Sequence, residues 1–371
     1  MKLWQIVVVV AVGIAYGVVE PGRFTYALGH ATLYVFLPPL LFEAAWNLNY
    51  KAIVRQWPAI VTLAGPGVLL TALIVAGALA IVRVPFGPAL LTGAILSATD
   101  PIAVVAVFRR IGVPKTLATI VECESLFNDA VAVMLYRIVL GALAVGTFGG
   151  GAIALVVLKA ATGAVAGAVV GVAFAYVVAR VLRRTNDVTL QILATAIVAY
   201  GAYFAADALS LSGIFATIAG GIAMRYYERR WIRLSIAGDV NRFWDLAALV
   251  ANVLVFFLVG AALQPAELAR EPVFVIAALV AVAVSRVVVA GLLLPSGYPR
   301  AWLDVVRLAG MRGALSLALA LALAPNVPYR QAIIDATFAV ALATLLASSL
   351  TVARVVRRAS RALERAPRRA I

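Results

Sequence analysis

Four polar side chains lie within six residues of a segment that is otherwise apolar enough to cross a membrane. The segment reads Glu124-Ser125-Leu126-Phe127-Asn128-Asp129. Glu124 and Asn128 are four residues apart, as are Ser125 and Asp129, so a helix places the two pairs as adjacent stripes on one side. A charged group at the bilayer centre costs at least about 2.5–3.5 kcal/mol. Such groups usually line a path or a binding site for ions or protons, and the pattern predicts one here.

The composition around this segment is that of an integral membrane protein. Of the 371 residues, 64% are hydrophobic and 13% are charged, whereas soluble domains have about 45–50% apolar and about 25% charged residues. Apolar runs long enough to span about 30 Å of hydrocarbon recur along the chain. We predict an all-α integral membrane protein with about twelve transmembrane helices, at residues 3–20, 31–48, 59–82, 88–108, 118–146, 151–182, 188–207, 212–224, 243–264, 272–294, 302–324 and 331–355.

Residue types that are scarce exclude several other functions. The single cysteine, Cys123, leaves no partner for a disulfide, and the single histidine, His30 in a predicted outer loop, removes most imidazole chemistry. No Gly-rich phosphate loop is visible, so transport driven by ATP within this chain is not expected. An intramembrane enzyme is disfavoured because no span carries HExxH, a Ser-His pair or a Gly-Ser-Gly nucleophile setting. The sequence implies no cofactor.

The positive charge is distributed unevenly between the predicted loops. The chain has a net charge of +15 from 31 Lys and Arg and 16 Asp and Glu. If both termini are cytoplasmic, most of the cations fall in cytoplasmic loops and the tail, as the positive-inside rule requires. We predict one transmembrane transporter domain over residues 1–355 and a short basic cytoplasmic tail over 356–371, held against anionic lipid.

Two of the predicted spans are interrupted. Residues 88–108 include Thr99-Asp100-Pro101, where the proline has no N–H and clashes with the carbonyl four residues back. Residues 302–324 include Gly310-Met311-Arg312-Gly313. An odd number of spans takes the chain from one to the other, so they cross the membrane in opposite directions. Two broken, crossing helices at mid-membrane are the signature of an inverted-repeat transporter.

The charged residues in the interrupted helices can have two roles. Asp100 and Arg312 are suitably placed to compensate the dipoles of the half-helices that meet there. Arg312 is also an isolated cation that needs a carboxylate, for which Glu124 and Asp129 are the candidates. We favour a pair with Glu124, because it leaves Asp129 free to titrate. Asn128 is expected to donate a hydrogen bond to freed backbone or to a carboxylate at a helix end.

The remaining intramembrane charges have simpler explanations. Glu43 follows Pro38-Pro39 near the end of its span, where reaching water is the alternative to a role in the ion site. Glu122 is placed at the cytoplasmic mouth of its span. The others are interpreted as structural or interfacial: Arg286, Arg307, Asp207, Asp245 and Asp335.

Four segments together resemble sodium/proton antiporters of the NhaP/NHE type, in the monovalent cation:proton antiporter family. Residues 37–45 read LPPLLFEAA, 93–101 read GAILSATDP, 124–129 read ESLFND and 312–320 read RGALSLALA. Their order and spacing also match, over nearly the whole chain. The resemblance implies a homodimer in the plasma membrane that serves pH homeostasis, with a core domain that moves against a dimerisation domain.

The resemblance also implies a role for each matching residue. Asp129 would bind Na⁺ and H⁺ in competition. Glu43, Asp100, Ser125 and the backbone carbonyl of Thr99 would line the ion site. Glu124 and Arg312 would form an ion pair that stabilises the core, and Asn128 would brace the broken helices. The Asn128-Asp129 pair, in place of two aspartates, is associated in such families with electroneutral exchange.

Some expectations depart from the family or compete with it. The family commonly has a further helix before Leu3, thirteen spans in all, which commonly contributes to the dimer contact. Hard oxygen donors suit an alkali cation, so Na⁺ or Li⁺ exchange for H⁺ is favoured. A K⁺/H⁺ antiporter of the same fold stays open as an alternative, and a passive cation channel is a weaker one.

Overall fold

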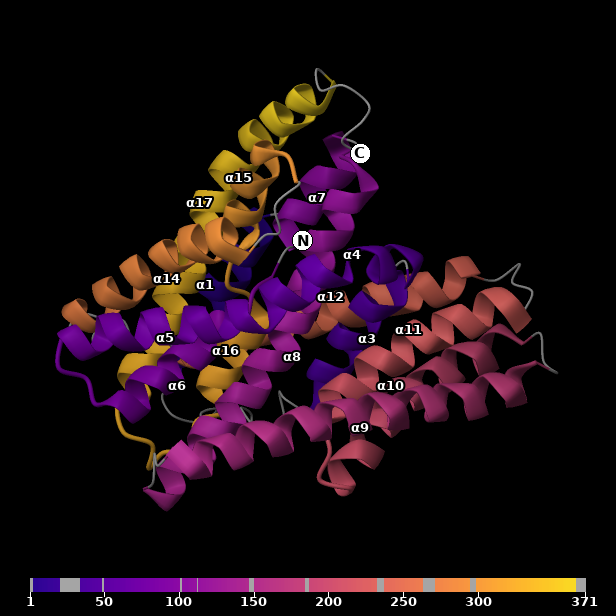
Figure 1. Cartoon of the computed structure of the whole chain (residues 1–371), viewed down its shortest axis with the longest axis horizontal. Helices are drawn as coiled ribbons and strands as arrows, with labels where there is room; N and C mark the ends of the chain where they lie inside the picture. Colours follow the sequence, from indigo (N-terminus) through magenta and orange to yellow (C-terminus); the bar gives the residue numbers. More distant parts are fainter. Residues whose placement is uncertain are drawn as a thin grey trace. The chain divides into compact units, whose positions relative to one another are not determined.

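A computed structural model describes residues 3–20, 34–48, 50–100, 102–111, 113–146, 150–183, 187–231, 237–262, 271–293 and 298–364. Every regular element within these ranges is an α-helix (Figure 1). Seven helical stretches of this described part are long and apolar enough to cross a membrane. The all-α membrane architecture is confirmed, and the total of twelve spans and the inverted repeat stay predictions.

The chain divides into two compact units, which we describe separately. Unit 1 consists of Met1–His30, Lys51–Leu140 and Phe256–Ile371, and unit 2 consists of Ala31–Tyr50 and Gly141–Val255. The single transporter domain predicted for residues 1–355 therefore has an internal division.

Unit 1 contains most of the helices. They are α1 (Leu3–Val19), α4 (Tyr50–Ala64), α5 (Pro66–Ile81), α6 (Phe86–Ser97), α7 (Ile102–Ile111), most of α8 (Lys115–Val145), the end of α12 (Ala237–Ala262), α14 (Pro272–Leu293), α15 (Arg300–Ala309), α16 (Ala314–Leu321) and α17 (Arg330–Glu364). One apolar cluster joins six of them, with Leu63, Phe108, Ile120, Val289 and Trp302 among its buried members. These side chains come from α4, α7, α8, α14 and α15. The cluster therefore holds together the helices that carry the polar residues of the candidate site.

Both predicted interruptions are present in unit 1. α6 ends at Ser97 and α7 begins at Ile102, while α15 ends at Ala309 and α16 begins at Ala314. Pro101, to which the first interruption was attributed, lies outside the described residues, as does His30. Glycines stand at both ends of the second interruption, as the C-cap of α15 and the N-cap of α16.

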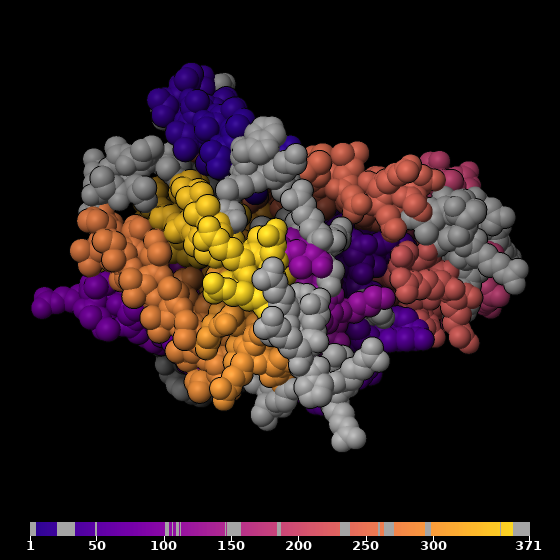
Figure 2. All heavy atoms as spheres, turned by 90° about the horizontal axis from the view of Figure 1, so that it is seen from above, coloured from indigo at the N-terminus to yellow at the C-terminus, as the bar shows by residue number. Residues whose placement is uncertain are grey.

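The last helix is longer than predicted. α17 runs for 35 residues to Glu364, past the boundary expected at residue 355, and only its first part, Arg330–Ser348, is apolar enough to be a span. The helix continues because Val352 and Val356 extend its buried face onto the apolar cluster of unit 1. Figure 2 shows α17 in yellow beside α14 and α15 in orange.

Unit 2 is built from α3 (Leu37–Asn47), α9 (Gly150–Leu182), α10 (Val188–Ala208), α11 (Gly213–Trp231) and most of α12. α9, α10 and α11 pack against one another (Figure 1). On α9, Gly167 and Gly171 lie so close to the backbone of Ser212 and Ala216 that a Cβ at either glycine would collide with it. Small residues of this kind let membrane helices approach closely.

Candidate functional site

The two interruptions lie against each other inside unit 1. The backbone N–H of Asp100 donates to the carbonyl of Met311 over 2.8 Å, and the Ser316 hydroxyl donates to the carbonyl of Ala98 over 3.3 Å. Ala98 and Met311 are almost fully buried. Buried backbone groups must be paired, and here each broken helix pairs groups that the other has freed.

The charges at the interruptions lie where the half-helix dipoles require them. The Asp100 side chain lies against Gly313, the N-cap of α16, so closely that a Cβ at Gly313 would collide with it. The Arg312 guanidinium donates from Nη1 to the carbonyl of Gly310, the C-cap of α15, over 2.5 Å. An anion at a helix N-terminus and a cation at a C-terminus are both favourable. The compensating role predicted for these two side chains agrees with this geometry.

The polar stripes of α8 face the first interruption. The Ser125 hydroxyl donates a short hydrogen bond to the carbonyl of Thr99. The Asn128 amide donates to Thr99 Oγ1 and to Glu124 Oε1, each over 3.3 Å. Asp129 accepts a hydrogen bond from the backbone of Thr99 and lies close enough to Asp100 for their charges to interact. The i,i+4 spacing therefore brings all four α8 side chains to one place.

Three buried oxygens of this constellation have no hydrogen-bond partner within the described residues, namely Glu124 Oε2, Asn128 Oδ1 and Asp129 Oδ1. Ionised carboxylates at Asp100 and Asp129 repel each other, and a cation or a proton between them removes that repulsion. The two carboxylates can therefore attract a positive charge, from a small cation or from H⁺.

Glu124 has a different ionic partner from the expected one. Its Oε1 pairs with Arg286 Nη1 of α14 over 2.7 Å, and both side chains are buried. Arg286 Nη2 also donates to the carbonyl of Val306 over 2.7 Å. The expected pair of Glu124 with Arg312 is absent among the described contacts, because Arg312 turns toward the end of α15 instead.

Arg286 is thus a site residue that sequence reasoning placed only among the structural ones. It is the one charged side chain in the 22 residues of α14. An isolated cation in an apolar span needs a buried acceptor. This requirement was the signal in the sequence that could have identified Arg286 as the partner of a buried carboxylate. Arg286 thus supplies a buried counter-charge to Glu124 without using Asp129.

The other predicted residues fall into two groups. Glu43 belongs to α3 of unit 2, where its Oε1 accepts from Asn47 over 2.6 Å. The other four predicted ion ligands lie together in unit 1: Thr99, Asp100, Ser125 and Asp129. Asp335 is buried and accepts from Gln331 over 3.0 Å, while Arg307 pairs with Asp304 over 3.1 Å. Both contacts agree with structural roles.

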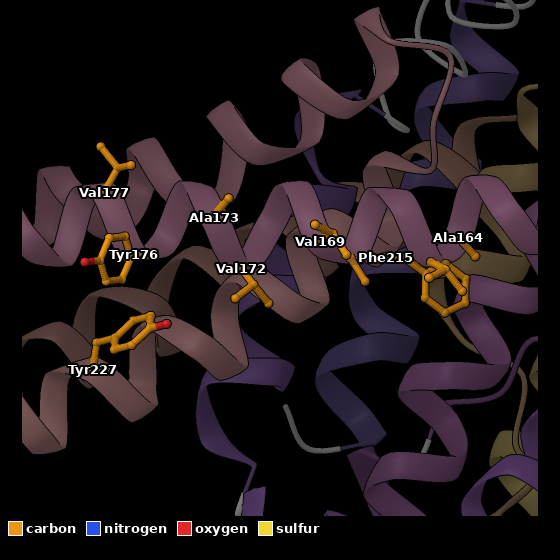
Figure 3. Close-up of a pocket in the computed structure, with 10 residues that line it drawn as sticks. Ala164, Val169, Val172, Ala173, Tyr176, Val177, Phe215 and Tyr227 are labelled. Carbon is orange, nitrogen blue, oxygen red and sulfur yellow. The ribbon is translucent and has the colours of Figure 1, made fainter.

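A groove on unit 2 has the wrong chemistry for ions. It has a volume of about 680 Å³ and lies between α9 and α11, as shown in Figure 3. Val172, Val177 and Phe215 are among its apolar lining residues, and the rings of Tyr176 and Tyr227 pack edge to face at its end. None of the described lining residues carries a charge, so the groove suits apolar chains.

Comparison with known proteins decides between the possible families. The family profile "Sodium/hydrogen exchanger, transmembrane" matches residues 1–358. The chain belongs to this family. The Na⁺/H⁺ antiporter NhaH of Halobacillus dabanensis is 32% identical to this exchanger over 321 residues, which cover 84% of this chain and 78% of NhaH. Sodium/hydrogen exchanger 7 of Arabidopsis thaliana is 32% identical over 350 residues, 85% of this chain but 30% of the plant protein.

A solved structure supports the fold of this exchanger. The sodium proton antiporter MjNhaP1 from Methanocaldococcus jannaschii superposes with a TM-score of 0.77 over 95% of this chain and 92% of its own, at 19% identity. Together with the apolar helices, the family match makes the exchanger a multi-pass membrane protein.

Proposed function

We propose that this exchanger moves Na⁺ or Li⁺ across the membrane in exchange for H⁺, with cation and proton competing for Asp129. The observation that supports this most directly is the unpartnered Oδ1 of Asp129, buried beside Asp100 at the interrupted helix. The relatives named as Na⁺/H⁺ antiporters support the same reaction.

The proposed cation ligands are all oxygens. They are the carboxylates of Asp129 and Asp100, the Ser125 hydroxyl and the carbonyl of Thr99. Glu43 of unit 2 is proposed as a further ligand. Within the described residues, no group of three or more His, Cys, Asp or Glu forms a cluster suited to a metal ion. Mixed hard oxygens with few charges suit an alkali cation better than a soft metal.

Coupling follows from the charge of the site. With either Na⁺ or H⁺ bound, one charge of the two carboxylates is neutralised. With neither bound, two like charges remain close together in a membrane interior, where a charge costs several kcal/mol. If only the neutralised site changes sides, cation and proton are exchanged obligatorily and one for one. We therefore propose electroneutral exchange.

The assembly and setting follow the family. We propose a homodimer in the plasma membrane, with both termini cytoplasmic. The exposed cations Arg354, Arg357 and Arg358 at the end of α17 support this orientation, because cytoplasmic ends of membrane helices are rich in Lys and Arg.

A cation panel with the purified protein in liposomes tests the proposal. The liposomes carry a pH dye and a preformed proton gradient, and Na⁺, Li⁺ or K⁺ is added outside. We expect dye recovery with Na⁺ and Li⁺, and none from folded Asp129→Asn, because a neutral amide cannot exchange a proton for a cation.

Each other outcome has a defined meaning. Recovery with K⁺ alone would keep the mechanism and replace the substrate by that of a K⁺/H⁺ antiporter. Cation flux without any proton counter-flow would indicate a passive channel. Robust coupled exchange by Asp129→Asn would contradict the assignment of the carrier residue.

A further inference from the structure

Side chains of α17 pair with backbone groups of the second interruption. The backbone N–H of Arg312 donates to Thr344 Oγ1 over 3.1 Å. One turn further along α17, the Ser348 hydroxyl donates to the carbonyl of Leu308 over 3.1 Å. These two side chains share one helix face by their i,i+4 spacing, and together they pair a donor and an acceptor that the helix break has left free.

The hydroxyl of Thr344 acts on Arg312 only as an acceptor. Its own proton is directed back along α17, toward the carbonyls of Val340 and Ala341 at 2.8 and 3.1 Å. This is the ordinary bond of a threonine inside a helix. A lone pair of Oγ1 accepts the hydrogen bond from the Arg312 N–H. Serine can reproduce this contact, whereas valine has the same shape but no acceptor.

The bond reaches the proposed ion site through a single peptide group. The Arg312 N–H and the Met311 carbonyl belong to the same planar peptide. Thr344 holds the N–H of that peptide, and the Asp100 N–H donates to its carbonyl over 2.8 Å. Asp100 lies beside Asp129. Hydrogen bonds in such a chain strengthen one another, so Thr344 acts on Asp100 with only one peptide between them.

We propose that Thr344 is a positioning residue for the cation site: it fixes the Met311–Arg312 peptide and, through it, the backbone of Asp100. Its effect on transport rests on the proposed function, while its effect on the backbone does not. Breaking the bond frees the peptide to rotate, which loosens Asp100 and weakens cation binding.

The test compares three folded variants with the unaltered protein. Thr344→Val removes the acceptor and Thr344→Ser retains it. Thr351→Val is the matched control, because Thr351 lies on the same helix and its hydroxyl donates to its own helix at Ala347 over 2.6 Å. Two quantities are measured: amide hydrogen exchange of the segment 308–314, and the Na⁺ concentration that gives half-maximal exchange.

We expect Thr344→Val to accelerate amide exchange in that segment and to raise the half-maximal Na⁺ concentration about fivefold, the factor that corresponds to the loss of one hydrogen bond. Thr344→Ser and Thr351→Val should behave like the unaltered protein in both measurements. If Thr344→Val does not fold, Thr344→Ala removes the same acceptor without branching and is judged by the same criteria.

The proposal is overturned if the variant without the acceptor leaves both quantities unchanged, or if Thr351→Val changes them equally. It is also overturned if Thr344→Ser fails to restore them. If the unaltered protein exchanges no cation at all, the proposed function fails, and amide exchange alone then decides whether Thr344 holds the peptide.

Discussion

At the scale of single residues, two carboxylates five positions apart on α8 have different surroundings. Glu124 is buried against Arg286 and receives the Asn128 amide. Asp129 instead lies near another carboxylate, Asp100. A permanently paired carboxylate holds structure, whereas one that lacks a cation is ready to accept H⁺ or Na⁺. From this division we propose a structural role for Glu124 and a transport role for Asp129.

The pair of Glu124 with Arg286 leads to a prediction on stability. Arg286→Ala leaves the Glu124 charge buried without its partner, a change that costs about 3–5 kcal/mol. We expect a clear fall in the thermal unfolding temperature of the detergent-solubilised protein. Arg307→Ala is the matched control, because its pair with Asp304 is largely exposed and such pairs contribute about 0–1 kcal/mol. Equal melting temperatures for the two variants would refute the structural role of Arg286.

At the scale of helices, the interruptions bring the ends of four short helices to one place. α6, α7, α15 and α16 each have 12 residues or fewer, too few to cross about 30 Å of hydrocarbon alone. Their unpaired ends supply dipoles and backbone groups at depth in the membrane. The structure satisfies these with one another, with Asp100 and Arg312, and with two hydroxyls of α17.

Because the two interruptions lie close together, we can predict how a methyl group added at Gly313 would affect transport. A Cβ at Gly313 would collide with the Asp100 side chain, while the backbone there is extended, with φ −124°, so strain from a positive φ plays no part. Gly313→Ala must displace Asp100, and overpacking of this kind costs about 1–3 kcal/mol. We expect the rate of Na⁺-driven proton efflux to fall at least about tenfold.

Gly77→Ala serves as the control for this substitution. Gly77 lies within α5 of the same unit, and a Cβ there meets nothing within 4 Å. Alanine favours a helix over glycine by about 1 kcal/mol, so Gly77→Ala should transport normally. Normal transport by Gly313→Ala would show that Asp100 need not lie against that helix end.

At the scale of the whole molecule, the two units differ in chemistry. Unit 1 contains both interrupted helices, the buried ion pair and the proposed ligands other than Glu43. Unit 2 contains the apolar groove and closely packed helices with glycines at their contacts. The separation into a core domain and a dimerisation domain that the family resemblance implies stays a prediction.

One-for-one exchange predicts that a membrane potential does not change the transport equilibrium. If each Na⁺ replaces one H⁺, no net charge crosses the membrane in a transport cycle. A membrane potential is worth about 2.3 kcal/mol per charge at 100 mV, so it does not affect the equilibrium of an exchange that moves no net charge. Liposomes with a K⁺ gradient and valinomycin provide the potential. We expect the Na⁺ gradient that just balances a given pH gradient to be the same with and without it. A shift of this balance point with voltage would indicate electrogenic exchange.

The sequence alone located much of the site, because its signals are local. Spacing along one helix placed Glu124, Ser125, Asn128 and Asp129 on one side, and Gly310 with Gly313 marked the second interruption. The partner of Glu124 was predicted wrongly, since Arg286 is 162 residues away in the chain and several cations were equally plausible. Thr344 gave no signal, because a threonine in an apolar helix usually bonds only to its own helix.

Composition and helical spacing thus determined that the chain is a helical membrane protein with a carboxylate in one broken helix, an arginine in the other, and two more carboxylates in a neighbouring span. Only the tertiary structure decided which helices approach one another, and hence which cation Glu124 pairs with and which hydroxyl holds the Met311–Arg312 peptide. The physical reason is that the apolar spans have similar sequences, so the sequence of one span does not reveal which other spans it packs against. Their neighbours are chosen by close packing at small residues and by the pairing of a few buried polar groups, and both depend on the whole fold.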